Sequence, residues 1–251
     1  MNSLRKTLLA CALMITTGAA LADGCDKLPG HAALTFALRG VVPPSGAPNG
    51  GLGFPMWLTL VDGSGRVCAV TTSLVNGDVT SDIWLGSRII SAQKATTANS
   101  FSTGALSLST ANLYSAVQPG GSLFGLQESN PIDAGVAYDG AAATFGTRFD
   151  PIVGRRIGGL NVFGGGLTLY QGGRKVGAIG VSGDTSCTDH VVAWKVRAAL
   201  GLNAAPGGLD KMLQDITPNP AGGTGLSASG FGHPTCLNNP TAANDGGSIV
   251  H

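Results

Sequence analysis

The most constraining feature of this sequence is a glycine-punctuated segment at residues 165–187, which reads GGLTLYQGGRKVGAIGVSGDTSC. Two short apolar runs, 166–170 and 175–182, flank the turn sequence QGGR, so the spacing predicts an antiparallel hairpin. Gly177 and Gly180 remove side chains from the second strand, so another backbone or a flat ligand can approach there. A bulge or helix packing is the more common reason for such glycines.

The other segments predict a second hairpin and several helices. The expected elements are a short helix at 29–39, strands at 55–62 and 66–72, an alanine-rich helix from 87, a short helix at 109–117, and a final helix from Asp184 or Thr185 to Leu200. This order predicts an α+β fold in which an antiparallel sheet of two hairpins is flanked by helices in a single domain.

The first 22 residues have the pattern of a secretory signal peptide. Arg5 and Lys6 precede an apolar run, and Ala20-Leu21-Ala22 fits a small-x-small cleavage site. The run is short for a membrane span, and no later stretch is long enough for one. We therefore expect an exported protein, periplasmic or secreted, with one domain at 23–202 and a Gly/Pro/Asn-rich extension at 203–251.

Charge is sparse in this chain. Charged residues make up 12% of the sequence and hydrophobic residues 43%. Removing Arg5 and Lys6 with the signal peptide leaves 13 basic residues against 14 acidic ones, so no basic block remains for nucleic acid or an anionic membrane. Such a surface fits a homo-oligomer that buries part of it, or an exported monomer with polar, uncharged loops.

Four cysteines remain when Cys11 leaves with the signal peptide. In an exported chain they predict two disulfides, because no pair has the Cys-x-x-Cys spacing of a metal or haem-attachment site. We predict Cys25–Cys68, which would pin the new N-terminus to a strand, and Cys187–Cys236, which would hold the tail. A crossed pairing, a single bridge with free thiols, and a metal site remain open alternatives.

Four strings in the chain carry a resemblance to a known family. They are LTLVDGSGRVCAV at 58–70, RIISAQKATTANSFS at 88–102, GGSLFGLQESNP at 120–131 and the segment at 165–194. Together they resemble the haem-binding GlcG/HbpS-like family (the DUF336 proteins, which include PduO-type C-terminal domains). The resemblance implies a helix-flanked sheet, frequent oligomers, and haem or a related tetrapyrrole as the ligand. The four cysteines, an insert between 103 and 165, and the tail depart from the compact family pattern.

Haem requires an axial ligand, an apolar slot and donors for its propionates. Among the histidines His31, His190, His233 and His251, we take His31 and His190 as candidate ligands of haem iron. Each also has a structural interpretation, as a surface, capping or core histidine. Met56 and the tyrosines at 114, 138 and 170 are further candidates.

The loop at 120–125 is the second candidate part of the site. Gly120, Gly121 and Gly125 can expose backbone amides to a propionate or another carboxylate, and Phe124 adds apolar surface. A structural turn is the alternative interpretation. Arg88 and Lys94 could each pair with an acid, but a solvated helix face is the expected environment for both.

No catalytic motif was found: the sequence has no His-Glu-x-x-His, no Gly-x-Ser-x-Gly and no P-loop. The first hypothesis is therefore an exported haem-binding or haem-handling protein without catalytic machinery of its own. The alternatives are an enzyme or binding module for a small carboxylated molecule near 120–130, and an oligomeric structural or sensory partner.

Overall fold

The computed structural model describes residues 24–44, 48–216, 226–236 and 240–250. The predicted signal peptide, its cleavage site and His251 lie outside these residues. The sheet contains β1 (Trp57–Asp62), β2 (Val67–Thr72), β3 (Gly166–Gln171) and β4 (Arg174–Ser182). The strand order is β2-β1-β4-β3 and every neighbouring pair is antiparallel, so the two predicted hairpins join into one sheet through β1 and β4.

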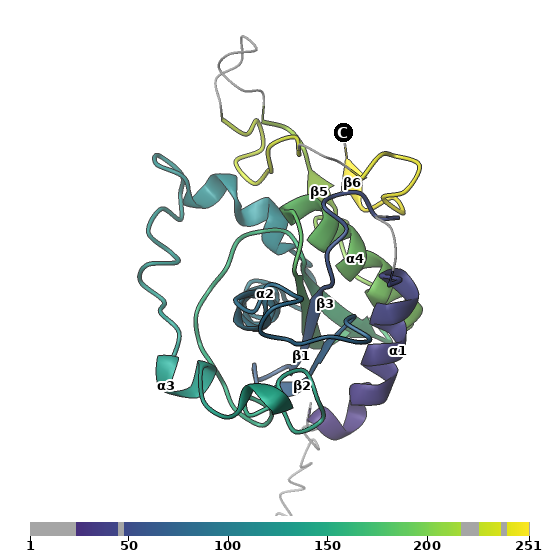
Figure 1. Ribbon diagram of the computed structural model, residues 1–251. Coiled ribbons are helices and arrows are strands. Elements are labelled where there is room, and N and C mark those ends of the chain that lie inside the picture. Colours follow the sequence, from purple (N-terminus) through teal and green to yellow (C-terminus); the bar gives the residue numbers. More distant parts are fainter. Residues whose placement is uncertain (1–23, 45–47, 217–225, 237–239, 251) are drawn as a thin grey trace, which may run out of the picture.

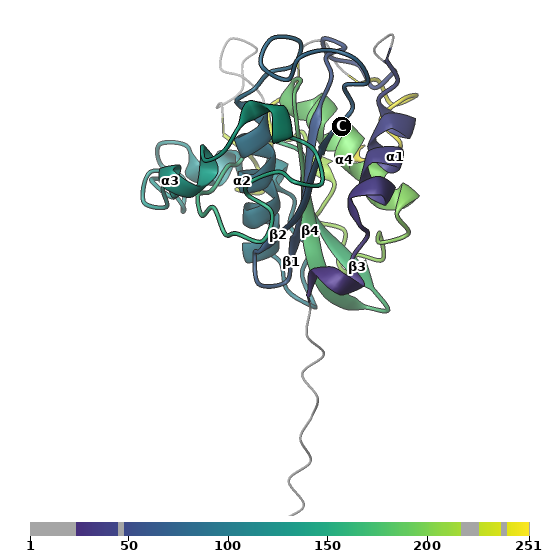
Figure 2. The same cartoon turned by 60° about the horizontal axis from the view of Figure 1, so that its bottom comes forward.

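Both faces of the sheet are covered. Helices α1 (His31–Val41) and α4 (Ser186–Ala199) pack on one face, and α2 (Ser87–Ser100) packs on the other (Figures 1 and 2). Because successive side chains of a strand point to opposite faces, Leu58 and Leu60 enter the core under α1 and α4, while Trp57 and Val61 enter the core under α2. The predicted α+β fold is confirmed.

Helix α2 lies close to the sheet because both the helix and β4 have small residues where they touch. A side chain at Gly180 would collide with the carbonyl of Ser91 and the amide of Ala95. Ala92, Ala95 and Ala98 are fully buried on the same helix. Helix packing, rather than ligand approach, therefore explains the glycine at position 180.

The insert at 103–165 wraps the outer side of α2 (Figure 1). It contains short helices only: η2 (Thr110–Leu113), η3 (Ser115–Val117), α3 (Ala134–Ala137) and η4 (Ala142–Thr144). The helix predicted at 109–117 is thus two 3-10 turns. Ala137, Ile152 and Ile157 of the insert join the core of α2, which buries this helix almost all round.

Arg88 and Lys94 are both buried, so the expectation of a solvated helix face is wrong for them. Nε and Nη2 of Arg88 donate to the two carboxylate oxygens of Asp150, at 2.9 and 2.5 Å. Nζ of Lys94 lies 2.6 Å from Oδ2 of Asp189. The insert and α4 supply these two carboxylates, which are remote from α2 in the sequence.

The ends of the chain are tied to the domain by two disulfides. Cys25, in η1 (Cys25–Lys27), is bonded to Cys68 of β2, and Cys187 of α4 is bonded to Cys236, which is the pairing that the sequence predicted. In the tail, β5 (Met212–Leu213) and β6 (Ile249–Val250) pair as a short parallel ribbon.

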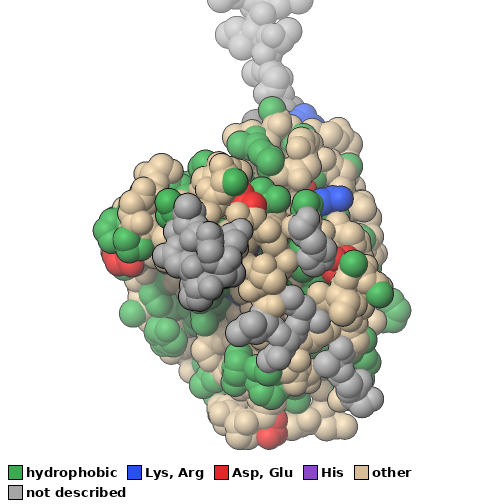
Figure 3. Space-filling view, turned by 90° about the horizontal axis from the view of Figure 1, so that it is seen from above, with side chains coloured by type: hydrophobic (Ala, Val, Ile, Leu, Met, Phe, Trp, Pro, Cys, Tyr) green, Lys and Arg blue, Asp and Glu red, His purple; other side chains and the backbone are tan. Residues whose placement is uncertain are grey.

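The surface carries little charge. Figure 3 shows only scattered charged side chains on the face seen from above, among uncharged polar and hydrophobic groups. Within the described part of the chain, no helix has both the length and the apolar character that a membrane span needs.

Candidate functional site

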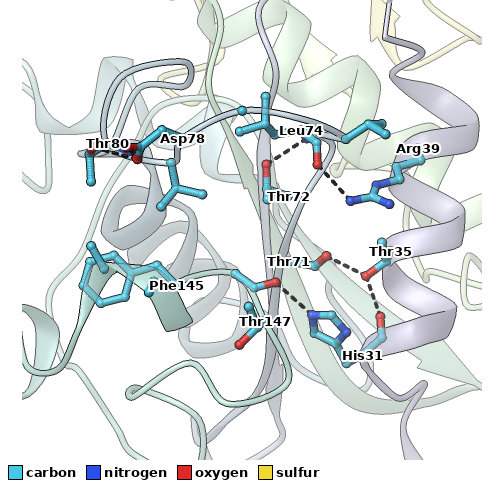
Figure 4. A pocket seen from close by; sticks show the side chains of 16 residues that line it. His31, Thr35, Arg39, Thr71, Thr72, Leu74, Asp78, Thr80, Phe145 and Thr147 are labelled. Carbon is cyan, nitrogen blue, oxygen red and sulfur yellow. Dashed lines mark hydrogen bonds between the residues drawn. The ribbon is translucent and has the colours of Figure 1, made fainter.

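A cavity of about 670 Å³ opens beside α1, in the size range of small-molecule sites. Its walls come from α1, the end of β2, the loop that follows β2, and the segment at 142–147 of the insert (Figure 4). The lining includes His31, Thr35, Arg39, Leu74, Phe145 and Gly146.

One face of α1 supplies the polar groups of this cavity. His31, Thr35 and Arg39 are spaced at i, i+4 and i+8, so they lie in a row on the helix, about 12 Å from first to last. Oγ1 of Thr35 donates to the carbonyl of His31 at 2.9 Å and lies 2.6 Å from Oγ1 of Thr71. The row is therefore anchored to β2 at its middle.

One nitrogen of the His31 ring, Nε2, makes a hydrogen bond to the backbone. Nε2 lies 2.9 Å from the carbonyl oxygen of Gly146. A carbonyl only accepts, so Nε2 carries a proton, and in the neutral ring Nδ1 then keeps its lone pair. No described residue is a partner of Nδ1, which makes it a nitrogen available to a ligand.

The wall opposite α1 is held by the buried pair of Arg88 and Asp150. The amide of Gly146 donates to Oδ2 of Asp150 at 2.8 Å, and the Arg88 guanidinium lies 3.8 Å from the ring centroid of Phe145. Gly146 has φ of +73°, which a residue with a side chain rarely adopts. The ion pair thereby positions both the acceptor of His31 and the largest apolar group of the cavity.

Charged groups lie at the mouth of the cavity. Arg39 is exposed, and its Nη2 donates to the carbonyl of Leu74 at 2.8 Å. Asp78 is also exposed, and hydrogen bonds from Thr80 lower the pKa of its carboxyl below the ordinary value. The cavity thus offers a cation for a carboxylate, a nitrogen donor, and apolar surface from Phe145 and Leu74.

His190 lies elsewhere, in the interior. Its side chain is fully buried in α4, and Nε2 lies 3.1 Å from the carbonyl of Ser248. Burial lowers the pKa of His190 to about 3, so the ring is neutral near pH 7. It does not line the cavity at His31, and its sequence neighbour Asp189 pairs with Lys94 instead of orienting it.

The loop at 120–125 borders a different cavity, of about 590 Å³, together with Tyr114 and residues of the tail. Gly120 and Gly121 line it. The amides of Gly121 and Phe124 donate to the carbonyls of Gln118 and Gly121, so two of the amides in this loop are used by turns. The Phe124 side chain is 67% exposed. The structure does not bring this loop and His31 into one site.

Sequence reasoning missed two contributors to the cavity. Arg39 could have been found, because the string HAALTFALR places it on the His31 face of the predicted helix. Phe145 could not, because nothing in the irregular insert indicates that it folds back beside α1.

Comparison with known proteins gives one family match. The profile of a family described as "Haem degrading protein HbpS-like" matches residues 51–198, which is more than half of the chain. No curated protein matches the chain significantly.

Solved structures with similar folds are remote. A PduOC:heme complex is 22% identical, covers 69% of this chain and 94% of its own, and has a TM-score of 0.45. The protein ORFY of Klebsiella pneumoniae is 23% identical over 69% and 90%, with a TM-score of 0.44. A double mutant of HbpS from Streptomyces reticuli is 16% identical over 79% and 99%, with a TM-score of 0.43. Membership of the family therefore rests on the profile match over residues 51–198 and not on these structures.

Proposed function

Because the chain belongs to the HbpS-like family, we propose that it is a haem-binding or haem-handling protein and that the cavity beside His31 receives the haem. The observation that carries this proposal is the His31 ring. Its Nε2 is fixed on Gly146, while Nδ1 has no partner in the described part of the chain. An imidazole held through one nitrogen and free at the other is the arrangement that an axial ligand requires.

The other residues of the cavity fit the same group. Arg39 offers a cation to a propionate two turns along the helix, and Phe145, Leu74 and Val75 offer apolar surface to a porphyrin ring. When bound, haem would supply redox chemistry at its iron. The chain's own contribution is to orient the imidazole, neutralise a carboxylate and shield one side of the ring.

A third cavity, of about 570 Å³, is more apolar but fits haem less well. It is lined by Phe101, Leu113, Leu123, Leu213 and Phe231 among others, and the described residues of its lining include no histidine, cysteine, methionine or tyrosine. None of these described residues is an axial ligand of the usual kinds.

Binding of a small carboxylated molecule is the second candidate function. The observation that favours it is the polar half of the same cavity, where Arg39 lies with the hydroxyls of Thr35, Thr71 and Thr147. A thermal-shift screen with organic acids tests it. A hit that disappears in Arg39→Ala, in a protein that gives no Soret band, would favour this function over haem binding.

Haemin titration of the purified exported form tests the first function. We expect a Soret band that shifts in His31→Ala and is unchanged in His190→Gln, which keeps a hydrogen-bonding group toward Ser248. Arg39→Ala should weaken haemin binding by roughly 10-fold without moving the band. A parent-like spectrum for His31→Ala would overturn the site, and absence of any Soret band would overturn the function. Bleaching of the band with a reductant and oxygen would separate degradation from storage.

Export and self-association complete the proposed function. Two disulfides in the structure support an oxidising compartment. Sparse surface charge and exposed apolar side chains such as Phe36 support a homo-oligomer. Mass spectrometry should find Asp23, or a residue within one or two positions of it, at the mature N-terminus, and light scattering should give a dimer or a larger assembly.

A further inference from the structure

Around the disulfide of the tail lies a cluster of soft donor atoms that the haem site does not use. The Cys187 and Cys236 sulfurs and a ring nitrogen of His233 all lie within 4.8 Å of one another. Sδ of Met212 lies 3.3 Å from Sγ of Cys187, and Nδ1 of His233 lies 3.9 Å from Sγ of Cys236. Three sulfurs and one imidazole thus lie in one cluster, with Met212 next to Cys187 and His233 next to Cys236.

The other disulfide has a different setting. Cys25 and Cys68 share their surroundings with the carboxylate of Asp62, and among the described residues no histidine belongs to that cluster. Both disulfides connect a terminal segment to the domain. At Cys187–Cys236, a thioether (Met212) and an imidazole (His233) lie beside the sulfurs. A disulfide that only holds the tail in place does not need a neighbouring methionine and histidine.

From this cluster we propose that reduction of the Cys187–Cys236 disulfide opens a copper(I) site formed by Cys187, Cys236, His233 and Met212. Thiolate and thioether sulfur select copper(I) among the common metals, and imidazole is compatible with it. Zinc is bound by thiolate and imidazole but has little use for a thioether. Met212 therefore distinguishes the two metals.

The opening step needs a dithiol reductant. Cys187 is fully buried and Cys236 is partly exposed, so a thiolate of the reductant attacks Sγ of Cys236 and the S–S bond breaks toward Cys187. Cys187 leaves as a thiolate at the second residue of α4, where the N-terminus of this 14-residue helix stabilises negative charge.

The second thiol of the reductant then displaces Cys236 and closes a disulfide within the reductant. Two electrons and two protons pass from the dithiol to the two protein sulfurs, which become thiols. Copper(I) binding forms two copper–thiolate bonds and releases those two protons.

In the oxidised protein Nδ1 of His233 carries the proton, because it faces the carbonyl of Pro234, so ligation through Nδ1 requires that proton to move to Nε2. Nε2 lies 2.8 Å from Oγ of Ser186, and that hydroxyl oxygen also accepts the amide of Gly164 at 2.7 Å. Nδ1 lies 2.7 Å from the carbonyl of Pro234, a contact that it would give up to the metal. The proton would then sit on Nε2 and be donated to Ser186, the outer hydrogen bond that a ligating histidine normally keeps.

The consequence for the fold is that one pair of sulfurs can tie the tail in two ways. In the oxidised protein, the disulfide joins Cys236 to α4. In the reduced protein, copper would bridge the same sulfurs and keep the tail in place. Reduced protein should accordingly regain resistance to proteolysis in the tail when copper(I) is added.

Anaerobic competition with the copper(I)–bicinchoninate complex tests the proposal without haem. Full-length protein is reduced with dithiothreitol and desalted before the titration. We expect one copper per chain to be captured by reduced protein and none by oxidised protein. A Cys25→Ser/Cys68→Ser double variant, which lacks the other bridge, is the matched control and should capture copper like the parent.

Three further variants sharpen the result. Cys187→Ser/Cys236→Ser should abolish capture, Ser186→Ala should weaken it roughly 10-fold or more, and Met212→Leu should weaken copper(I) but leave zinc binding unchanged. Circular dichroism confirms that each reduced variant is folded, and urea-unfolded reduced chain should bind more weakly than folded protein. No capture by folded reduced protein, equal capture by unfolded chain, or indifference to Met212→Leu would each overturn the copper(I) site.

Discussion

Arg88 and Lys94 lie six residues apart on α2 and both end in buried ion pairs, yet they anchor different parts of the molecule. Arg88 reaches outward to Asp150 of the insert. Lys94 reaches past the sheet to Asp189 of α4 and also donates to the carbonyl of Val181. The first pair fixes the wall of the His31 cavity, and the second joins the two helical layers.

The chemistry of the two pairs differs as well. Arg88 donates to both carboxylate oxygens of Asp150 and to the carbonyl of Ala137, so its guanidinium is held in a planar, bidentate geometry. In the second pair, burial lowers the pKa of Lys94 and raises the pKa of Asp189 to about 7. The Asp189 carboxyl can therefore take up a proton near physiological pH, which removes the negative charge that faces Lys94. The comparison predicts different responses to mutation and to pH.

Arg88→Met should have the largest effect. It leaves Asp150 buried without its cation, a change that costs about 3–5 kcal/mol in other buried pairs. It also frees the loop that presents Phe145 and the carbonyl of Gly146. Chemical denaturation near neutral pH should show the lost stability. A loss below about 1 kcal/mol would mean that the insert does not depend on this pair.

Lys94→Met should cost less, and its cost should depend on pH. The pKa of Asp189, raised by burial, would rise further without Lys94, so the carboxyl is neutral at acidic pH and charged at alkaline pH. We expect about 2–3 kcal/mol of lost stability near pH 8 and clearly less near pH 5. Denaturation curves at both pH values measure the difference, and an equal loss at both would contradict the raised pKa.

Replacing the lysine pair by apolar residues should cost about 1–3 kcal/mol, because the amide of Asp184 and the carbonyl of Val181 lose their partners, and it should change the slope of stability with pH. In the parent, folded Asp189 holds a proton that the unfolded chain releases near pH 4, so its contribution to stability falls as pH rises from about 4 to about 7. Lys94→Met/Asp189→Leu has no carboxyl at position 189 and therefore no such pH dependence. The stability of the variant relative to the parent should accordingly increase as pH rises from about 4 to about 7.

The matched control for this double variant is Arg88→Met/Asp150→Leu. Asp150 accepts two backbone amides, from Gly146 and Ile152, whereas Asp189 accepts that of Asp184, so the control leaves one more amide without its partner. The control should therefore be less stable than the lysine-pair variant by about 1 kcal/mol. Equal stability of the two double variants would remove the distinction between the pairs.

Phe145→Leu should have a smaller effect on stability than loss of either ion pair. It removes the ring that lies against the Arg88 guanidinium, a contact worth about 1 kcal/mol. Phe149→Leu is the control, because Phe149 is 65% exposed beside Arg148 and should change stability by less than about 0.5 kcal/mol. Thermal unfolding compares them, and a larger loss for Phe149→Leu would reverse the expected order.

Much of the fold follows from local patterns in the sequence. The glycine-centred turns and alternating apolar residues predict both hairpins, and Thr185 caps α4 through the amide of Thr188 as its position suggests. The candidate site was only half predictable. His31 was recognised as a candidate ligand, but the row that it forms with Arg39, and the loop that faces it, were not.

The sequence by itself determined the two hairpins and the helices at either end of the domain, because turn chemistry and side-chain periodicity are local properties. The cysteine pairing was one of several possibilities until the fold brought the partners together. Only the tertiary structure decided the environments of Arg88, Lys94 and His190, because burial depends on what packs over a helix from elsewhere in the chain. It also placed His31 and the loop at 120–125 beside separate cavities. In the sequence, a basic residue of a buried ion pair cannot be told from a solvent-exposed one, because its carboxylate partner lies far away in the chain and comes close only when the chain folds.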